Sequence, residues 1–217
     1  GLDAKNPGIV LPQVDLDNAV EEAVTGALSF NGQRCTALKI LFVHEDLLDG
    51  FLERFAARVN ALKPGMPWEP GVALTPLPEP GKTDYLHAVL EDAVAKGATV
   101  LTGGKARPDL GPAFFEPTVL IDVPPDADLH SQEVFDPVVY VEVVDTLEEA
   151  LARANDTDYG LNSSVWAAPA TARRLAGALE SGTVNINEGY APAWMALGAP
   201  MGGWKRSGMG RRHGEHG

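Results

Sequence analysis

With 217 residues, the chain is long enough to bury the core of one medium-sized domain, and its 45% hydrophobic residues are typical of a soluble globular protein. The formal net charge of -13, from 30 acidic and 17 basic residues, argues against a nucleic-acid partner because the phosphates would be repelled. No apolar run approaches the roughly 18 residues that span a bilayer, so no membrane contact is expected, and the single cysteine and the lack of a leader sequence favour a reducing, cytoplasmic setting.

Strand and helix patterns alternate along the chain. In chain order they predict a strand at 8–11, a helix at 15–29, a strand at 38–43, a helix at 45–62, an ordered Pro- and Gly-rich loop at 63–81, a helix at 83–96, strands at 98–101, 114–121 and 138–144, a helix at 147–154, a strand at 163–166, a helix at 169–180 and a strand at 183–187. Because parallel strands need crossover helices, the alternation predicts an α/β fold with a largely parallel open sheet flanked by helices. No Gly-x-Gly-x-x-Gly motif follows a strand and opens a helix, so we expect no complete dinucleotide-binding unit.

The only cysteine, Cys35, follows Asn31-Gly32-Gln33-Arg34 between a predicted helix and a predicted strand. Cysteine attacks as a thiolate, and the adjacent Arg34 and the N–H groups of a Gly-bearing turn would stabilise that charge. These neighbours favour a nucleophile; the alternative is a small buried hydrophobic residue. His213 and His216 lie three residues apart, but without a nearby Cys or carboxylate cluster we expect a solvated tail and no metal site.

Five segments occur in the same order as in the aldehyde dehydrogenase superfamily. They are Lys5-Asn6-Pro7 with Ile9-Val10, Gly32-Gln33-Arg34-Cys35, Glu133-Val134-Phe135-Asp136-Pro137, Asn155 with Tyr159-Gly160-Leu161, and the run from Pro200 to Gly208. The resemblance covers essentially the whole chain but matches only the catalytic domain of that family. It implies that residues 1–217 are an isolated aldehyde dehydrogenase catalytic domain without the Rossmann-type cofactor domain. It also implies NAD or NADP as cofactor and a homo-oligomer in the full-length context.

The resemblance implies a role for each of three motif residues. Cys35 would add to the aldehyde carbon, giving a thiohemiacetal that loses hydride and leaves a thioester for water to cleave. Glu133 resembles the carboxylate that binds the nicotinamide ribose, and Phe135 resembles the aromatic residue beside the nicotinamide ring. The alternative for these two is an ordinary strand-edge acid and a core aromatic. The resemblance implies Gly where Asp136 stands, so we expect the backbone or the local charge to differ here.

The family's general base is a glutamate, and Gly1 stands at the corresponding position. Asp3 is a possible substitute, although its offset would place it on a different side of a strand or turn. Glu215 resembles a second family carboxylate that can assist proton transfer near the active-site tunnel. The alternative for Glu215 is a solvated acid of the chain's tail.

The two halves of the chain resemble different members of the family. The first 85 or so residues look like non-phosphorylating glyceraldehyde-3-phosphate dehydrogenases, whereas the half from Thr99 onward looks like succinate-semialdehyde dehydrogenases. Both substrates are small anionic aldehydes, so Arg34 would act as an anion clamp for either of them. The alternative role of Arg34 is a structural ion pair with a local acid. We favour succinate semialdehyde because residues 188–198 would shape the substrate mouth. Two alternatives to a dehydrogenase remain. One is a folded fragment without dehydrogenase turnover, and the other is a self-associating interaction module.

Overall fold

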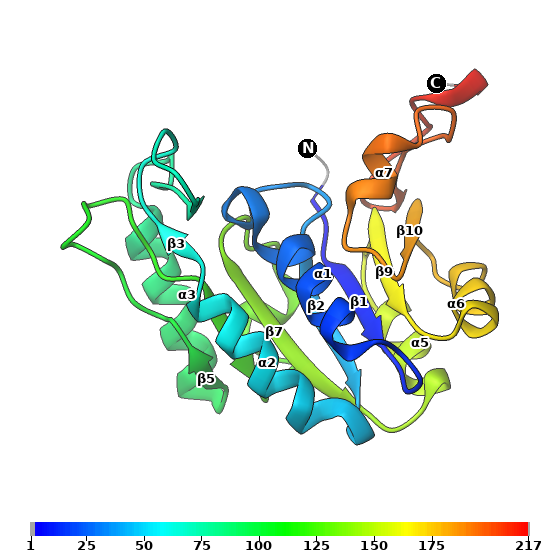
Figure 1. The fold of residues 1–217 in the computed structure, drawn as a ribbon, viewed down its shortest axis with the longest axis horizontal. Coiled ribbons are helices and arrows are strands. Elements are labelled where there is room, and N and C mark those ends of the chain that lie inside the picture. The colour runs from blue at the N-terminus through cyan, green and yellow to red at the C-terminus, as the bar shows by residue number, and fades with distance from the viewer. Residues whose placement is uncertain (1–2, 217) are drawn as a thin grey trace.

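The main strands form one seven-stranded sheet in the order β10-β9-β1-β2-β7-β6-β5 (Figure 1). The computed structural model describes residues 3–216. The strands span Asn6–Val10 (β1), Leu38–His44 (β2), Thr99–Thr102 (β5), Thr118–Ile121 (β6), Val138–Val144 (β7), Asn162–Trp166 (β9) and Thr183–Ile186 (β10). Every neighbouring pair runs parallel except β5 and β6, so the expected largely parallel α/β sheet is confirmed.

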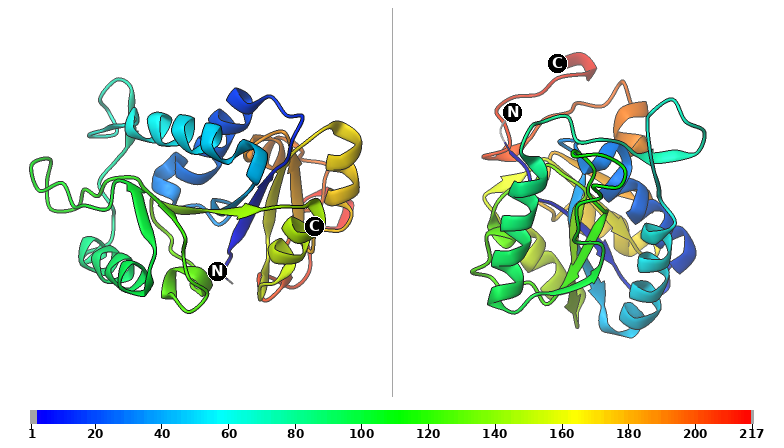
Figure 2. Two further views of the ribbon diagram at one scale, coloured as in Figure 1. Left: turned by 90° about the horizontal axis from the view of Figure 1, so that it is seen from below. Right: turned by 90° about the vertical axis from the view of Figure 1, so that its left-hand side faces the viewer.

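Helices cover both faces of the sheet (Figure 2). One face carries α1 (Leu16–Leu28) and α2 (Leu48–Asn60), and the other carries α3 (Lys82–Lys96), α4 (Asp128–Ser131), α5 (Leu147–Asn155) and α6 (Pro169–Ala176). Side chains alternate along β2: Ile40 and Phe42 pack with the α3-to-α6 layer, whereas Leu41 and Val43 pack with α1 and α2. Burial on both faces explains why this strand is a continuous apolar run in the sequence.

Several expected elements are shorter than predicted. Of the helix expected at 45–62, α2 covers Leu48–Asn60, and Glu45–Leu47 before it is 3-10 helix. Of the strand expected at 114–121 only β6 forms, because Pro117 has no N–H to donate and Phe115 makes an isolated bridge with Ala106. The helix expected at 169–180 ends at Ala176. Beyond it the N–H groups of Ala178 and Leu179 both donate to the Leu175 carbonyl, which closes the chain into a tight turn.

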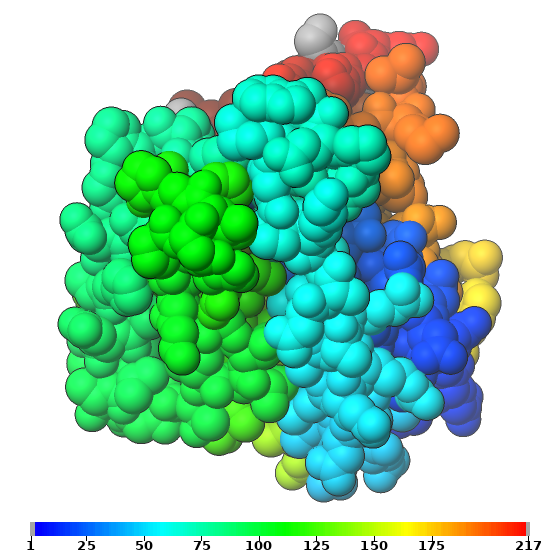
Figure 3. Space-filling view, turned by 60° about the vertical axis from the view of Figure 1, so that its left-hand side comes forward, coloured from blue at the N-terminus to red at the C-terminus, as the bar shows by residue number. Residues whose placement is uncertain are grey.

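Several short elements had no counterpart in the sequence prediction. They are α4, β3 (Lys63–Pro64), β4 (Val72–Leu74), β8 (Tyr159–Gly160), α7 (Ala191–Met195), β11 (Trp204–Lys205) and turns of 3-10 helix at Ser29–Gly32 and Gly214–His216. Elements this short do not show a hydrophobic period. The loop at 63–81 lies beside the loop around residues 105–115, where the Leu77 N–H donates to the Ala113 carbonyl at 2.8 Å (Figure 3). Within residues 3–216, no helix is long and apolar enough to cross a membrane.

The chain after β10 returns to the sheet and packs against the start of that strand. There β11 pairs antiparallel with β8, and Ser207 Oγ accepts from the Gly160 N–H at 3.1 Å and donates to the Asp3 carbonyl at 2.8 Å. Gly182 lies so close to this returning segment that a Cβ there would be 1.5 Å from the Gly202 carbonyl oxygen. The returning segment therefore needs a glycine at position 182.

We expect Gly182→Ala to lower the free energy of unfolding by at least about 2 kcal/mol, because a methyl group would push two backbone segments apart. Urea unfolding of both proteins would measure this loss. Gly198→Ala is the matched control, since a Cβ at Gly198 meets nothing within 4 Å. Equal stability of the two variants would contradict the close approach at Gly182.

Candidate active site

The candidate site residues lie at the amino edge of the sheet, the upper end in Figure 1. Cys35 comes shortly before β2, Glu133 and Phe135 come shortly before β7, and Asp3 comes shortly before β1. Because β1, β2 and β7 are parallel neighbours, these three segments converge on one edge of the sheet. Ligands of open α/β sheets commonly bind at the carboxyl ends of the strands, so this site uses the opposite edge.

Three buried asparagines fasten the segment around Cys35 to the sheet. Asn6 Nδ2 donates at 2.8 Å to the carbonyl oxygens of both Cys35 and Ala37. The Asn162 N–H donates to Asn6 Oδ1 at 3.0 Å, and Asn162 Oδ1 accepts from Asn185 Nδ2 at 3.0 Å. All three side chains are buried. A buried amide is stable only when its donors and acceptors are paired, so this asparagine chain fixes β1, β9 and β10 relative to Cys35.

Cys35 itself is exposed, so the alternative of a buried hydrophobic cysteine is wrong. It lies in residues 32–37, which we call the Cys35 turn, and the Ala37 N–H closes this turn by donating to the Arg34 carbonyl at 3.0 Å. The backbone of the turn is held from inside while the thiol faces solvent. A fixed backbone and an accessible sulfur are what a nucleophile requires.

Arg34 connects the Cys35 turn to the end of α1 and to the loop after β10. Its Nη2 donates to the carbonyls of Thr25 at 3.2 Å and Gly26 at 2.7 Å, and its Nη1 donates to Thr36 Oγ1 at 3.0 Å. The guanidinium lies over the Tyr190 ring, 3.8 Å from the ring centre. Burial lowers the pKa of Arg34. Its partners are therefore carbonyls, a hydroxyl and an aromatic ring, rather than the local acid considered from the sequence.

Glu133 and Phe135 lie on the segment that leads into β7. Glu133 Oε1 accepts from the Ala4 N–H at 3.0 Å. The carboxyl is half-buried, and burial, followed by the nearby Asp3 carboxyl, raises the pKa of Glu133. A carboxyl that the protein holds through one oxygen can accept sugar hydroxyls on the other, so its surroundings fit the expected ribose contact. Phe135 is half-buried and lines an open hollow of about 440 Å³ together with Phe30.

An ion cluster adjoins the Cys35 turn. Asp136, whose side chain has no exposed surface, pairs with Lys82 at 2.9 Å between Oδ2 and Nζ. Lys39 is also buried, and its Nζ donates to the carbonyls of Gly32 at 2.9 Å and Asp136 at 2.8 Å. Burial lowers the pKa of Lys39 to about 7, although the Asp136 and Glu133 carboxyls act to raise it. Burial raises the pKa of Asp136, against the opposing effect of Lys82.

The remaining proton-transfer candidates are less well placed. Glu215 lies in the last turn, Gly214–His216, with an exposed side chain, and no hydrogen bond or ion pair joins its carboxylate to another group in residues 3–216. Gly1, at the position of the family's general base, lies outside the described residues. Asp3 has a left-handed backbone with φ of 44°, and its carboxyl lies near that of Glu133.

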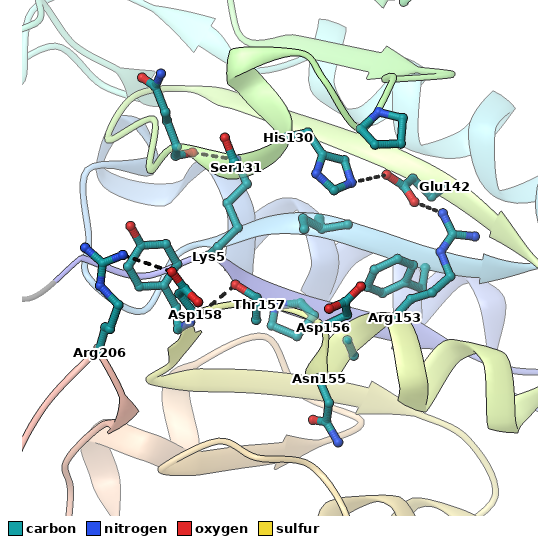
Figure 4. Close-up of a pocket in the computed structure, with 17 residues that line it drawn as sticks. Lys5, His130, Ser131, Glu142, Arg153, Asn155, Asp156, Thr157, Asp158 and Arg206 are labelled. Atoms are coloured by element: carbon teal, nitrogen blue, oxygen red, sulfur yellow. Dashed lines mark hydrogen bonds and ion pairs between the residues drawn. The ribbon is translucent and has the colours of Figure 1, made fainter.

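A separate hollow measures about 770 Å³, and none of these candidate residues lines it (Figure 4). Ile40 and Phe42 of β2 line it together with charged side chains. Glu142 forms an ion pair with Arg153 and lies 3.8 Å from His130 Nε2. Glu142 and Arg153 are paired with one another, and no cysteine lines this hollow, so we place the chemistry at Cys35.

The asparagine chain and the Asp136–Lys82 pair were missed in the sequence prediction. A usable signal existed for the first: Asn6, Asn162 and Asn185 belong to strands whose other residues are largely apolar or small. A polar side chain in a strand buried on both faces must find buried partners. No comparable pattern marks Asp136 and Lys82, which come from separate elements.

Replacing Asn6 with Ala should leave two inward-facing carbonyls without a donor. We therefore expect Asn6→Ala to lower the free energy of unfolding by roughly 2–4 kcal/mol, measured by urea unfolding. Asn18 is the matched control because its exposed amide makes a single bond of 3.3 Å, and Asn18→Ala should change stability by less than about 0.5 kcal/mol. Similar losses in the two variants would refute the anchoring role of Asn6.

The pKa of Lys39 predicts how stability depends on pH. Between about pH 7 and the ordinary lysine value of 10.5, the unfolded chain binds more protons than the folded one, so stability should rise with pH. One such lysine contributes up to about 1.4 kcal/mol per pH unit. Burial also lowers the pKa of Lys5 to about 7. Lys39→Met should therefore reduce the slope of stability against pH without abolishing it.

Urea unfolding at several values between about pH 7.5 and 9.5 would measure this slope. Exposed Lys105 provides the control, because Lys105→Met should leave the slope of the unaltered protein unchanged. A slope that stays the same in Lys39→Met would show that Lys39 does not titrate in this range.

The sequence and the fold of this chain were compared with those of known proteins. The sequence pattern described as "Aldehyde dehydrogenase family" matches residues 1–217. A Mycobacterium tuberculosis protein, provisionally named a succinate-semialdehyde dehydrogenase with NADP(+), is 44% identical over all of this chain and 42% of its own length. The NADP(+) succinate-semialdehyde dehydrogenase of Deinococcus radiodurans is 43% identical over 97% of this chain and 43% of its own length.

Solved structures give the same result. Succinate-semialdehyde dehydrogenase from Burkholderia pseudomallei superimposes with a TM-score of 0.90 at 40% identity, over 99% of this chain and 44% of that one. The NAD+ complex of aldehyde dehydrogenase from Bacillus cereus superimposes with a TM-score of 0.92 at 33% identity, over 99% of this chain and 43% of that one. The chain thus spans less than half the length of the proteins it matches. It belongs to the aldehyde dehydrogenase family.

Proposed function

We propose that residues 1–217 are the catalytic domain of an enzyme that oxidises succinate semialdehyde to succinate, with NADP+ or NAD+ as the electron acceptor. The observation that carries this proposal is the exposed Cys35 thiol on a backbone fastened from inside by Asn6. The names of the Mycobacterium and Deinococcus relatives support the substrate and favour NADP+. A homo-oligomer and a cytoplasmic location belong to the same proposal for the whole protein.

In the proposed reaction, the Cys35 sulfur attacks the aldehyde carbon and the carbonyl oxygen becomes an oxyanion. The Cys35 backbone N–H donates to no group in residues 3–216 and can stabilise that oxyanion. Loss of hydride from the same carbon restores the carbonyl as a thioester. Water then adds to the thioester carbon and gives up one proton to solvent, and the C–S bond breaks to release the carboxylic acid and the Cys35 thiolate.

Glu133 and Phe135 are the proposed cofactor contacts in this chain. The bound nicotinamide would supply the hydride acceptor for the reaction. The second oxygen of the Glu133 carboxyl would accept ribose hydroxyls, and Phe135 would give the ring an apolar neighbour. Glu215 is proposed to assist proton transfer to or from water. Its exposure leaves the carboxylate available for that exchange.

Arg34 is proposed to attract the carboxylate of the substrate. Its hydrogen bonds to Thr25, Gly26 and Thr36 already engage both terminal nitrogens, so it is not free for a new bidentate grip. Its positive charge, next to Cys35, would instead act over a longer distance. Such an interaction favours short anionic aldehydes as a class and weakens as the salt concentration rises.

Replacing Cys35 with Ser should lower kcat for NADP+-dependent oxidation of succinate semialdehyde by roughly a thousandfold or more in the whole protein, because the thioester route is lost. Absorbance of the reduced cofactor would measure the rate, with glyceraldehyde 3-phosphate as the comparison substrate. Ser131→Ala, which changes an exposed residue of the other hollow, should retain full activity. Oxidation that persists in Cys35→Ser would overturn the proposed mechanism.

A further inference from the structure

We propose that Asp136 is a positioning residue: paired with Lys82, it holds the Cys35 turn and the segment carrying Glu133 and Phe135 in fixed relation to one another. The inference rests on the proposed function, because it concerns the reactivity of the same thiol. It assigns a purpose to a carboxylate whose side chain has no exposed surface.

Three segments that are distant in the sequence meet at the Asp136 carboxylate. Oδ2 pairs at 2.9 Å with Nζ of Lys82, the first residue of α3. Oδ1 accepts at 3.4 Å from Nε2 of Gln33 in the Cys35 turn, and the same Nε2 donates to Glu79 Oε2 at 3.2 Å. Asp136 itself directly follows Phe135. The carboxylate therefore connects the nucleophile, α3 and the proposed cofactor contacts.

The backbone of Asp136 makes a second connection to the Cys35 turn. Lys39 Nζ bridges the Asp136 and Gly32 carbonyls at 2.8 and 2.9 Å. Gly32 has φ of 65°, and a Cβ there would be 2.6 Å from the Asp136 carbonyl oxygen. The two backbones thus lie as close as a glycine permits. Because Gly32 and Gln33 directly precede Arg34 and Cys35, a shift of Asp136 would displace the thiol.

Each charge of the Asp136–Lys82 pair would be unfavourable at its position without the other. A lysine at the first position of a helix faces the positive end of the helix dipole, which is an unfavourable place for a cation. A carboxylate with no exposed surface is costly unless a partner offsets its lost hydration. Their pairing reduces both costs. The outcome is a buried ionic contact that ties the start of α3 to the site.

Alkylation of the protein with iodoacetamide tests the proposal, because Cys35 is the only cysteine and no cofactor or substrate is needed. The rate at pH 7 would be compared among the unaltered protein, Asp136→Asn, Lys82→Met and the double variant. We expect both single variants to react at least roughly threefold more slowly, because each releases the turn that favours the thiolate. The double variant should be no slower than the slower single variant, since all three remove one contact.

A simple effect of charge gives a different pattern. Removing the negative charge of Asp136 would then speed alkylation, and removing the positive charge of Lys82 would slow it. Opposite changes in the two single variants, or unchanged rates in both, would overturn the positioning role. Asp109→Asn, which breaks the exposed ion pair with Arg107, is the control and should leave the rate unchanged.

Turnover of the whole protein gives an independent measurement. Positioning predicts that Asp136→Asn and Lys82→Met lower kcat while KM for the aldehyde changes by less than about twofold. A rise in KM at unchanged kcat would instead indicate lost substrate binding and contradict the proposal. If the unaltered protein oxidised no aldehyde, the proposed function would fail, yet the alkylation rates would still decide the role of Asp136.

Discussion

The buried amide of Asn6 is the constraint on which the candidate site depends. Its two N–H groups are taken by the carbonyls of Cys35 and Ala37, and its oxygen is taken by the Asn162 N–H. Hydrogen bonds are directional, so all of these donors and acceptors are paired in only one position of the Cys35 backbone relative to β1 and β9. The thiol can then be exposed without being mobile, because the restraint acts through the carbonyls behind it.

Charged groups reinforce the same edge of the sheet. Lys39 bridges two carbonyls near the Cys35 turn, and Lys5 donates to the Gln132 carbonyl at 2.7 Å just before Glu133. Both lysine amino groups donate to carbonyls of segments that lack regular secondary structure. Those carbonyls take no part in the hydrogen bonds of an α-helix or between strands. The apolar layers on the two faces of the sheet stabilise the fold, whereas these polar contacts determine where its loops lie.

The sequence allowed the fold to be predicted well where hydrophobic periodicity was long. The predicted strand at 138–144 coincides with β7, whereas the helix predicted at 169–180 ran past Ala176 because a local turn replaces its last residues. Motif order was enough to single out Cys35, Glu133 and Phe135 as candidates, whereas their position at one edge of the sheet came from the structure. The partners of Arg34 and Asp136 were not predictable in the same way. They are backbone carbonyls, an aromatic ring and a lysine of another element, and such contacts form only when the chain has folded.

The position of β1 in the interior of the sheet affects folding kinetics. The first strand of the chain is hydrogen-bonded to β2 on one side and to β9 on the other, and the bond between Asn6 and Asn162 spans 156 residues. Closing so long a loop costs chain entropy before stabilising contacts form. The high contact order should therefore make formation of the complete sheet slow. During synthesis, one edge of β1 stays unpaired until β9 has emerged from the ribosome. Until then, the unpaired backbone groups of that edge are open to association with other strands.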